Sequence, residues 1–370
     1  MRKLCLFLAC GVTLILQAQD SLKLRFRSRA LLDASVTSFQ EQNVQGYYRL
    51  EDFRVGFKAE YHNMEIKADI GLGSGKVAIK DLLLQATWKN HTLAIGNTYD
   101  PFSMDMLIST ADLRFHQSAT SVLAFTDGRK LGITWHYQKP SFYVASGIYT
   151  YNDINKIGTN QRNSLVSTSR AVWRKQQTTE RLLHFGGAFS FRTAPVNQKD
   201  YNKEISAAGV TSMLPEPLLA INIGRPQKEF KGVIEALVTG SHYLIQGEYY
   251  LNRYHMSGHK NYQPHGGYIQ ASYLLKGKGF KYDTTCAVPG RPRSKQALEL
   301  SVRFNYTDMN DKEADIWGGE EKDLSVGLNF YLNEYIGFKI NGSYTWIGKH
   351  CNQNYKNNYF VPQARIQYIF

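Results

Sequence analysis

Hydrophobic and charged side chains alternate with a period of two along residues 21–35. The apolar positions of this stretch are Leu22, Leu24, Phe26, Ala30 and Leu32. The intervening basic positions are Lys23, Arg25, Arg27 and Arg29. A β-strand points successive side chains to opposite faces, whereas a helix would scatter both sets around its circumference. A packed core cannot desolvate four cations without partners, so the pattern favours a strand with lipid on one face and a water-filled barrel on the other.

The same alternation returns along the chain and predicts about 16 strands, an even number that is typical of bacterial outer-membrane barrels. The strands are expected at residues 21–35, 49–61, 64–73, 77–88, 91–97, 129–137, 142–151, 164–174, 181–192, 230–239, 241–252, 267–275, 296–306, 323–332, 335–346 and 359–370. If the first strand rises from the periplasm, the long connections 98–125 and 193–229 lie outside, as expected for such barrels. The long connection 276–295 counts as periplasmic, so it is either a constriction element or a sign of a miscounted strand. The predicted fold is all-β, a transmembrane antiparallel β-barrel with inward-folded loops.

The N-terminus predicts export. Arg2 and Lys3 precede an apolar run over residues 4–16, and Ala18 is a small residue suited to cleavage, which is typical of a secretory signal peptide. We expect a signal peptide at residues 1–18 and a barrel domain at 19–370. No later segment is apolar enough for a membrane helix, so membrane insertion would require a barrel. The last strand ends on the aromatic Phe370, which resembles the assembly signal of barrels in the outer membrane of Gram-negative bacteria.

The net positive charge of the chain indicates which classes of partner it suits. The formal net charge is +13, and it is about +11 without Arg2 and Lys3. Such a balance suits nucleic acid, an anionic membrane surface or an anion pathway, and export argues against nucleic acid. Aromatic residues make up 13% of the chain, which suits the girdles of a membrane barrel but also a sugar-binding β-protein. Cys286 and Cys351 remain after the signal, as one disulfide or two thiols; the strand count puts them at opposite ends and predicts that they stay free.

Motifs of catalysis are not visible in the sequence. It has no Gly-x-Ser-x-Gly elbow and no His-Glu-x-x-His helix. His350 and Cys351 alone are too few ligands for a metal site. The sequence therefore predicts neither an enzyme nor a bound cofactor.

Basic residues collect on the face opposite the lipid-facing positions. This set comprises Lys23, Arg25, Arg27, Arg29, Arg54, Lys58, Lys67, Arg170, Arg174, Arg303, Lys339 and Arg365. Rings of Arg and Lys favour anions in a pore, although inward charges also hydrate a lumen and pair with acids such as Glu60 and Glu299. The connection 98–125 either lies on the surface or folds inward and narrows the pore, which would place Arg114 and His116 at or near the eyelet.

Several stretches resemble the phosphate-selective porin O/P family. They are residues 29–33, 96–115, 233–249, 268–275, 298–306 and 323–333. The resemblance implies a trimeric 16-stranded outer-membrane channel that passes phosphate or polyphosphate through an Arg- and Lys-lined path. The chain departs from the family at Glu51-Asp52, where paired arginines are usual before the retained Arg54, and at Ala111, where a basic residue is common. These departures weaken the expectation of phosphate selectivity but not that of the fold.

We therefore expect a porin that passes small anionic solutes, with outer-membrane lipids around it and no nucleic-acid partner. Two alternatives remain open. One is a weakly selective or organic-solute porin on the same fold, which Glu51 and Asp52 favour. The other is a non-conducting barrel whose outer loops act as an adhesin or receptor.

Overall fold

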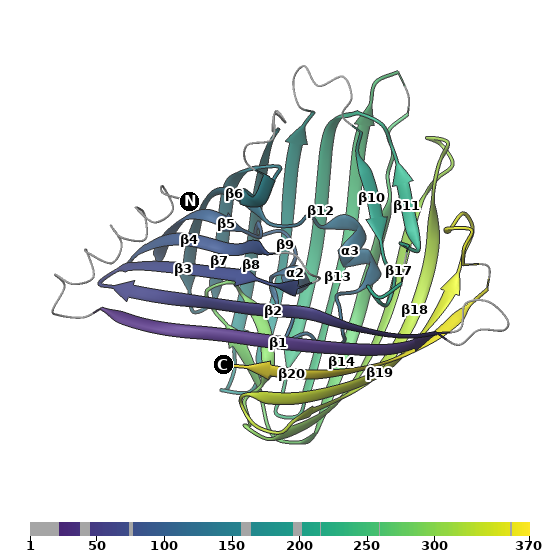
Figure 1. Cartoon of the computed structure of the whole chain (residues 1–370). Helices are drawn as coiled ribbons and strands as arrows, with labels where there is room; N and C mark the ends of the chain where they lie inside the picture. The colour runs from purple at the N-terminus through teal and green to yellow at the C-terminus, as the bar shows by residue number, and fades with distance from the viewer. Residues whose placement is uncertain are drawn as a thin grey trace.

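Sixteen antiparallel strands close into one barrel in the computed structural model, which describes residues 22–37, 45–73, 77–156, 164–194, 202–214, 216–258, 260–355 and 357–370 (Figure 1). The barrel strands, in their order around the wall, are β1 (Lys23–Thr37), β2 (Gln45–Tyr61), β3 (Met64–Gly71), β4 (Ala78–Trp88), β5 (His91–Thr98), β6 (Lys130–Lys139), β7 (Phe142–Thr150), β8 (Leu165–Gln176), β9 (Leu182–Thr193), β12 (Pro226–Thr239), β13 (Tyr243–Met256), β14 (His265–Lys276), β17 (Ala297–Asp311), β18 (Ile316–Tyr331), β19 (Ile336–Ile347) and β20 (Tyr359–Ile369). The predicted fold and strand number are confirmed.

The barrel closes where β1 pairs with β20. The register runs from Arg29 opposite Ile369 to Ser35 opposite Gln363. Residues 23–27 extend past this seam and pair only with β2 among the described strands. Closure leaves no free sheet edge along the paired part of the wall, so the backbone hydrogen bonds that lipid cannot supply are made inside the protein.

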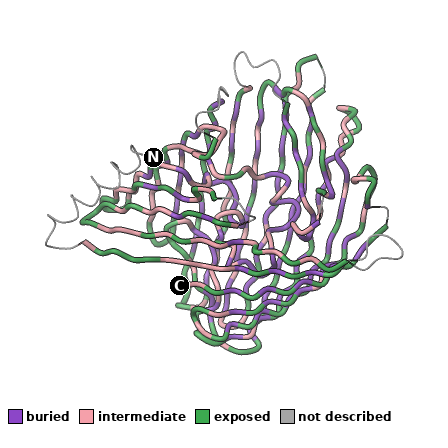
Figure 2. The backbone as a smooth tube through the Cα atoms, in the orientation of Figure 1, coloured by how far each residue is buried: buried purple, intermediate pink, exposed green. Residues whose placement is uncertain are grey.

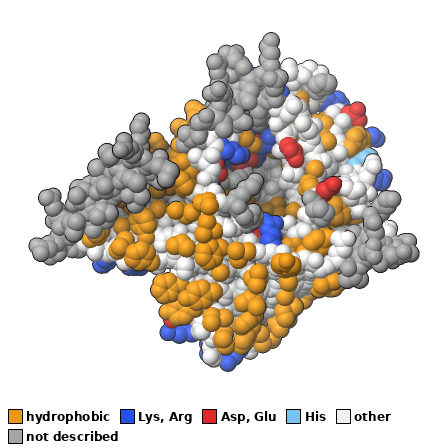
Figure 3. All heavy atoms as spheres, viewed as in Figure 1, with side chains coloured by type: hydrophobic (Ala, Val, Ile, Leu, Met, Phe, Trp, Pro, Cys, Tyr) orange, Lys and Arg blue, Asp and Glu red, His pale blue; other side chains and the backbone are white. Residues whose placement is uncertain are grey.

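The alternation in the sequence becomes an outer apolar face and an inner polar face. Figure 2 shows buried and exposed positions taking turns along the barrel strands. In β1 the Phe26 side chain is 68% exposed on the outside, whereas Asp33 is 3% exposed on the inside. Figure 3 shows hydrophobic side chains spread over the outer face of the barrel and charged side chains in the hollow at its centre. Among the described residues, no helix is long and apolar enough to cross a membrane.

Tight turns join the strands at the periplasmic end. Two-residue turns at His62-Asn63 and Lys89-Asn90 connect β2 to β3 and β4 to β5. His62 and Lys89 have φ angles of 51° and 53°, as expected for the primed turns that match the twist of paired strands. The imidazole of His91 packs between Trp88 and Trp135, with ring centroids 6.0 Å and 5.8 Å away, so aromatic rings form part of a girdle at this rim.

Seven short elements lie outside the barrel wall in the described ranges. They are α2 (Met104–Leu107), α3 (Thr120–Phe125), η2 (Ile154–Lys156), β10 (Glu204–Ala207), β11 (Leu219–Asn222), β15 (Phe280–Asp283) and β16 (Val288–Pro292). The sequence predicted irregular connections where α2, α3 and the two hairpins stand. These elements build two apolar clusters inside the barrel. One contains Phe125 of α3 and Leu219 of β11, and the other contains Met104 of α2 and Phe280 of β15.

Several barrel strands are longer than the sequence predicted, and β17 and β18 show this most clearly. β17 continues to Asp311 and β18 starts at Ile316, whereas the prediction ended the first strand at residue 306 and began the second at 323. Outward positions of this extension are polar, as at Asp308 and Glu320. A strand that rises above the lipid has no reason to present an apolar face, so the alternation stops before the strand does.

Candidate pore and its constriction

The connection between β5 and β6 folds into the barrel, as one of the two sequence alternatives predicted. It carries α2 and α3, and it lies against the wall formed by β13 to β20. The carboxylate of Glu248 on β13 accepts the backbone N–H groups of Met104 (2.7 Å) and Asp105 (3.0 Å) at the start of α2. Further along, Lys339 on β19 donates to the carbonyl oxygens of Ala111 (3.1 Å) and Leu113. Charged wall residues therefore fix this inner loop by its main chain.

The β15–β16 hairpin folds into the barrel from the periplasmic end. Arg170 on β8 donates to the carbonyl oxygens of Cys286 (2.6 Å) and Ala287 (2.8 Å), while its Nε bonds Glu235 at 3.0 Å. Arg174 on the same strand donates to the Thr284 carbonyl oxygen at 3.0 Å. The long periplasmic connection is thus a lumenal insert, and the strand count was right.

The inner loop and the periplasmic hairpin contact each other inside the barrel. Arg114 of the loop donates to the carbonyl oxygen of Gly290 at 2.6 Å. In return, Arg291 of the hairpin donates to the Asp112 carboxylate at 2.9 Å. Two reciprocal contacts therefore join segments that are far apart in the sequence.

The β10–β11 hairpin is a third insert at the outer end. Its residue Ile205 packs in the same apolar cluster as Phe125 of α3. Beside it, Asp127 lies 3.0 Å from Lys231, 3.5 Å from Lys203 and 3.5 Å from Lys130. Burial raises the pKa of the Asp127 carboxyl, but the three lysines outweigh it and hold that pKa well below the usual range. This carboxylate stays ionised and links the hairpin to the wall.

A cavity of about 500 Å³ remains between these inserts and strands β1 to β5, and we call it the wall cavity. Its basic lining residues are Arg27, Arg29, Arg54, Lys67, Arg129 and Arg291. Its acidic lining residues are Asp69, Asp81, Asp112 and Asp283. Residues 106–113 of the inner loop form the opposite side. The open part of the lumen is therefore polar, and its charge is weighted towards cations.

Carboxylates stand between the cations of the wall. Arg27 lies 2.8 Å from Asp69, and Lys67 lies 2.7 Å from Asp81. Arg129 donates to the second oxygen of Asp81 at 2.7 Å. In the Arg27–Asp69 and Lys67–Asp81 pairs the basic side chain is the more exposed member, so a solute in the cavity meets the cations first.

Asp52 bridges two arginines of the wall, Arg29 and Arg54. Its Oδ2 accepts from Arg29 Nε at 2.7 Å and from Arg54 Nη2 at 3.0 Å. The register explains its position: Leu31 pairs with Asp52 and Leu32 with Leu50, so Glu51 is the extra residue of a β-bulge. The bulge turns Glu51 towards Ser212, which donates to it at 3.2 Å, and leaves Asp52 facing the lumen.

Six of the sequence-predicted pore residues lie on the β1–β2 side. Arg27, Arg29 and Arg54 line the wall cavity. Lys58 lies between Glu60 (3.0 Å) and Glu65 (2.7 Å) further towards the periplasm. Arg25 lies 3.7 Å from Glu60, and Lys23 is exposed at the end of the strand. That these six residues form a cationic path stays a prediction, whereas the positions of the other predicted pore residues need a correction.

Arg114, Arg170, Arg303 and Lys339 do not line an open path in this structure. Each is at most 2% exposed. Arg303 donates to the Gln117 carbonyl oxygen at 2.9 Å and stacks on Phe115, and the other three bind loop or hairpin carbonyls as described above. The sequence placed Arg170, Arg303 and Lys339 correctly on the inner face of the wall, but inserts cover that face. Their role in the structure is to hold those inserts. Arg114 was expected at the eyelet, and it is instead buried where the inner loop contacts the periplasmic hairpin.

His116 is likewise not at the constriction. Its ring contacts Asn341 of β19, and its carbonyl oxygen accepts from Arg365 at 2.7 Å. Burial lowers the pKa of His116 to about 4, helped by the charge of Arg365. The imidazole is therefore neutral at physiological pH.

Two lining residues were missed by the sequence reasoning. Arg129 precedes β6, and Arg291 lies in the periplasmic hairpin. Arg129 begins the predicted strand 129–137 at the parity of the outward Ile133 and Trp135, so alternation did not mark it as inward. Arg291 lies in a connection, about which strand alternation carries no information. Cys286 and Cys351 are both free, as predicted. In the described ranges, no group of three or more His, Cys, Asp or Glu side chains is placed to hold a metal ion.

The model of the phosphate-selective porin O and P family matches residues 19–370. This chain belongs to that family. A curated relative, a Caulobacter vibrioides protein described only as uncharacterized, is 24% identical over 332 residues, and the match covers 79% of this chain. The chain spans about 64% of the length of that relative.

Solved structures share the fold at low identity. The OmpT outer-membrane protein of Vibrio cholerae in its trimer form gives a TM-score of 0.61 at 11% identity, over 95% of this chain and 100% of that one. An anion-selective porin from Comamonas acidovorans gives 0.60 at 9% identity, over 95% and 100%. The DcaP channel of Acinetobacter baumannii gives 0.56 at 10% identity, over 95% and 98%. Family and barrel place this chain in the outer membrane of a Gram-negative bacterium and support a channel rather than an enzyme.

Proposed function

We propose that this porin is a diffusion channel for small anions, which pass through the wall cavity. The observation that carries the proposal is the lining of that cavity. Six basic side chains face four acidic ones, and the basic set includes five arginines. Cations along a narrow polar path lower the free energy of an anion there and raise that of a cation.

Phosphate-bearing solutes are the anions that we propose for this path. Guanidinium groups offer planar pairs of N–H donors that match the oxygens of a phosphate group. Arg29 and Arg54 stand opposite each other across β1 and β2 and share one carboxylate, so two such groups lie side by side. The family description, phosphate-selective porin O and P, supports the same class of solute.

A weakly selective porin is the second candidate, and the shared carboxylate is the observation that favours it. Asp52 cancels part of the charge of Arg29 and Arg54, and Asp69 and Asp81 do the same for their basic partners. If each pair acts as a neutral unit, the cavity hydrates solutes of either sign without a strong preference.

Reversal potentials in planar bilayers distinguish the two candidates. The purified porin is placed in a tenfold KCl gradient, and phosphate is then added. We expect a reversal potential whose sign shows that chloride permeates more readily than potassium. We also expect that phosphate reduces the chloride current. The Arg29→Ala variant should lose much of this preference, whereas Lys175→Ala, at an exposed position of β8 (Leu165–Gln176), should keep it. A potential near zero favours the weakly selective porin. The absence of any conductance refutes both channel candidates and favours a non-conducting barrel that acts through its outer loops.

We also propose residues 19–370 as the barrel domain and a homotrimer as the assembly. The first follows the extent of the family match, and the second follows the Vibrio cholerae relative in its trimer form. Outward apolar side chains on every part of the wall leave room for contacts with a second copy as well as with lipid. Cross-linking in native membranes should give a species three times the mass of one chain, and a monomer alone would refute the trimer.

A further inference from the structure

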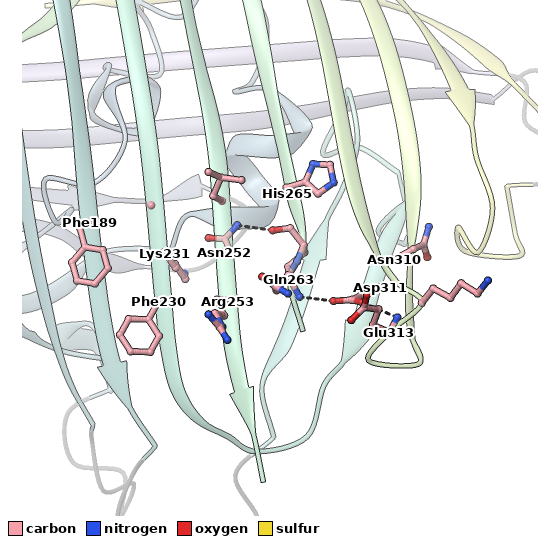
Figure 4. Close-up of a pocket in the computed structure, with 14 residues that line it drawn as sticks. Phe189, Phe230, Lys231, Asn252, Arg253, Gln263, His265, Asn310, Asp311 and Glu313 are labelled. Atoms are coloured by element: carbon pink, nitrogen blue, oxygen red, sulfur yellow. Dashed lines mark hydrogen bonds between the residues drawn. The ribbon is translucent and has the colours of Figure 1, made fainter. Parts of the chain in front are cut away.

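A groove with a volume of about 720 Å³ lies on the outer surface of the barrel, near its extracellular end. It crosses β9, β12, β13 and β14, and residues 263–264, the end of β17 at 310–311 and the following residues 312–313 border it. It is separate from the wall cavity, which lies inside the barrel along β1 to β5. Figure 4 shows its labelled residues on the outer ends of these strands.

A glycine creates the floor of the groove. In the register of the sheet, Gly232 on β12 stands between Phe189 on β9 and Leu251 on β13. Phe189 is 51% exposed and Leu251 60% exposed, so this row faces outward towards lipid. A Cβ atom on Gly232 would meet only the Leu251 carbonyl oxygen, at 3.6 Å. The missing side chain leaves a slot between two apolar neighbours that is suited to a hydrocarbon chain.

Basic side chains stand directly above this apolar floor. The next row outward pairs Phe230 with Arg253, and the row beyond pairs Lys228 with His255. Figure 4 shows the rings of Phe189 and Phe230 on one side of the Arg253 guanidinium. With its oxygen turned to Arg253, the Asn261 amide accepts from Nη2 at 2.6 Å and Nε at 3.1 Å, which holds the guanidinium at the rim.

The acids at this rim also contact the neighbouring connection between β13 and β14. The two carboxylate oxygens of Asp311 accept the backbone N–H groups of Gln263 (2.8 Å) and Glu313 (3.0 Å). Glu313 lies 3.7 Å from Lys260. Arg253 and Lys228 lie on outward rows of the sheet, on the extracellular side of the apolar slot, where cationic side chains of a membrane barrel suit lipid headgroups.

We propose that this groove binds a phosphate-bearing lipid of the outer leaflet. Its acyl chain lies in the slot over Gly232, between Phe189 and Leu251. Its phosphate is bound by Arg253, with Lys228 beside it. A membrane-facing site with an apolar floor and cations at headgroup depth is complementary to an anionic lipid in both respects. The site is independent of the proposed channel function, because no groove residue named here lines the wall cavity.

Native mass spectrometry of the detergent-solubilised porin, titrated with diphosphorylated lipid A, tests the proposal. We expect one tightly bound lipid per chain in wild type. Arg253→Ala should weaken binding about tenfold, the loss of one charge-assisted contact. Gly232→Ile fills the slot without changing the charge and should weaken binding by a similar factor. Ala236→Ile, which adds the same side chain at an outward position of β12 below the groove, is the matched control and should bind as wild type.

Each result bears on one part of the proposal. A phosphate-free form of the same lipid should bind the wild type as weakly as lipid A binds Arg253→Ala, and equal binding of the two lipids would overturn the role of the cations. Equal binding by Gly232→Ile and wild type would overturn the slot. The mobility of unheated protein in gels checks that each variant is folded. Conductance should be unchanged in all three variants, which separates this test from that of the channel.

Discussion

Replacing Asp52 with asparagine is expected to increase the anion selectivity of the porin. The carboxylate of Asp52 lies 2.7 Å from Arg29 Nε and 3.0 Å from Arg54 Nη2. An anion bound at those guanidinium groups would stand about 6 Å from the carboxylate. At that distance two unit charges repel by about 0.7 kcal/mol in water and by about 3 kcal/mol at an effective dielectric constant of about 20. Screening by salt at physiological ionic strength roughly halves the repulsion of about 0.7 kcal/mol that applies in water.

The Asp52→Asn variant removes this repulsion and keeps the size of the side chain. Even the screened value in water corresponds to a gain of about two- to threefold in the ratio of chloride to potassium permeability. The assay is the reversal potential in a tenfold KCl gradient, compared with wild type. Glu313→Gln is the control, because it removes the same charge from a side chain that is 79% exposed outside the lumen. It should leave the potential unchanged.

An unchanged potential in folded Asp52→Asn would refute the reasoning. Ions would then not pass between Arg29 and Arg54, and the wall cavity would not be the conducting route. A shift towards cations would refute it more strongly, because it would mean that Asp52 positions the two arginines and that their placement matters more than its charge.

Three further outcomes follow from the structure. Arg291→Ala removes the contact with Asp112 and should loosen the periplasmic hairpin, so single-channel recordings should show larger or noisier conductance than wild type, and identical traces would mean that the hairpin does not limit the current. Because burial lowers the pKa of His116 to about 4, the unfolded chain binds a proton there at a higher pH than the folded one, and stability falls as the pH drops below about 6.5. Wild type should lose about 2 kcal/mol of unfolding free energy from this group between pH 7 and pH 5, and His116→Asn should show that much less loss in urea titrations. Cys286 and Cys351 should both react with a thiol reagent in the denatured, unreduced mature protein, whereas Cys286 in the folded protein should react slowly at neutral pH because burial raises the pKa of its thiol to about 11.

The barrel could be predicted from the sequence because lipid imposes a simple rule on it. The outward residues of a strand are mostly apolar wherever the strand crosses the hydrocarbon, and β1 follows this rule from Leu24 to Leu32 except at Ser28. The rule does not apply above the membrane, and there the prediction lost the ends of β17 and β18. It also does not apply inside the lumen, where α2, α3 and the two inner hairpins meet side chains rather than lipid.

The candidate site could be predicted only in part, for the same reason. Alternation identifies which residues face inward, and it predicted the same pore-lining role for Arg29 and Arg170. It does not say what lies opposite them. Arg170 faces the periplasmic hairpin and binds its carbonyl oxygens, whereas Arg29 faces the wall cavity. That difference depends on contacts between residues more than 100 positions apart, which no local pattern in the sequence contains.

The position of the inserts determines where an anion preference can arise. The covered arginines are largely neutralised by acids at close range, as Arg170 is by Glu235 at 2.8 Å and Arg365 by Asp33 at 2.6 Å. A buried pair of opposite charges produces little field at a distance, so these residues add little to selectivity. The wall cavity differs, since its basic side chains outnumber its acids and basic side chains such as Arg27 are partly exposed. Selectivity should therefore respond to single charge changes at Asp52 or Arg29, whereas changes at Arg170 or Arg365 should act through the stability of the inserts.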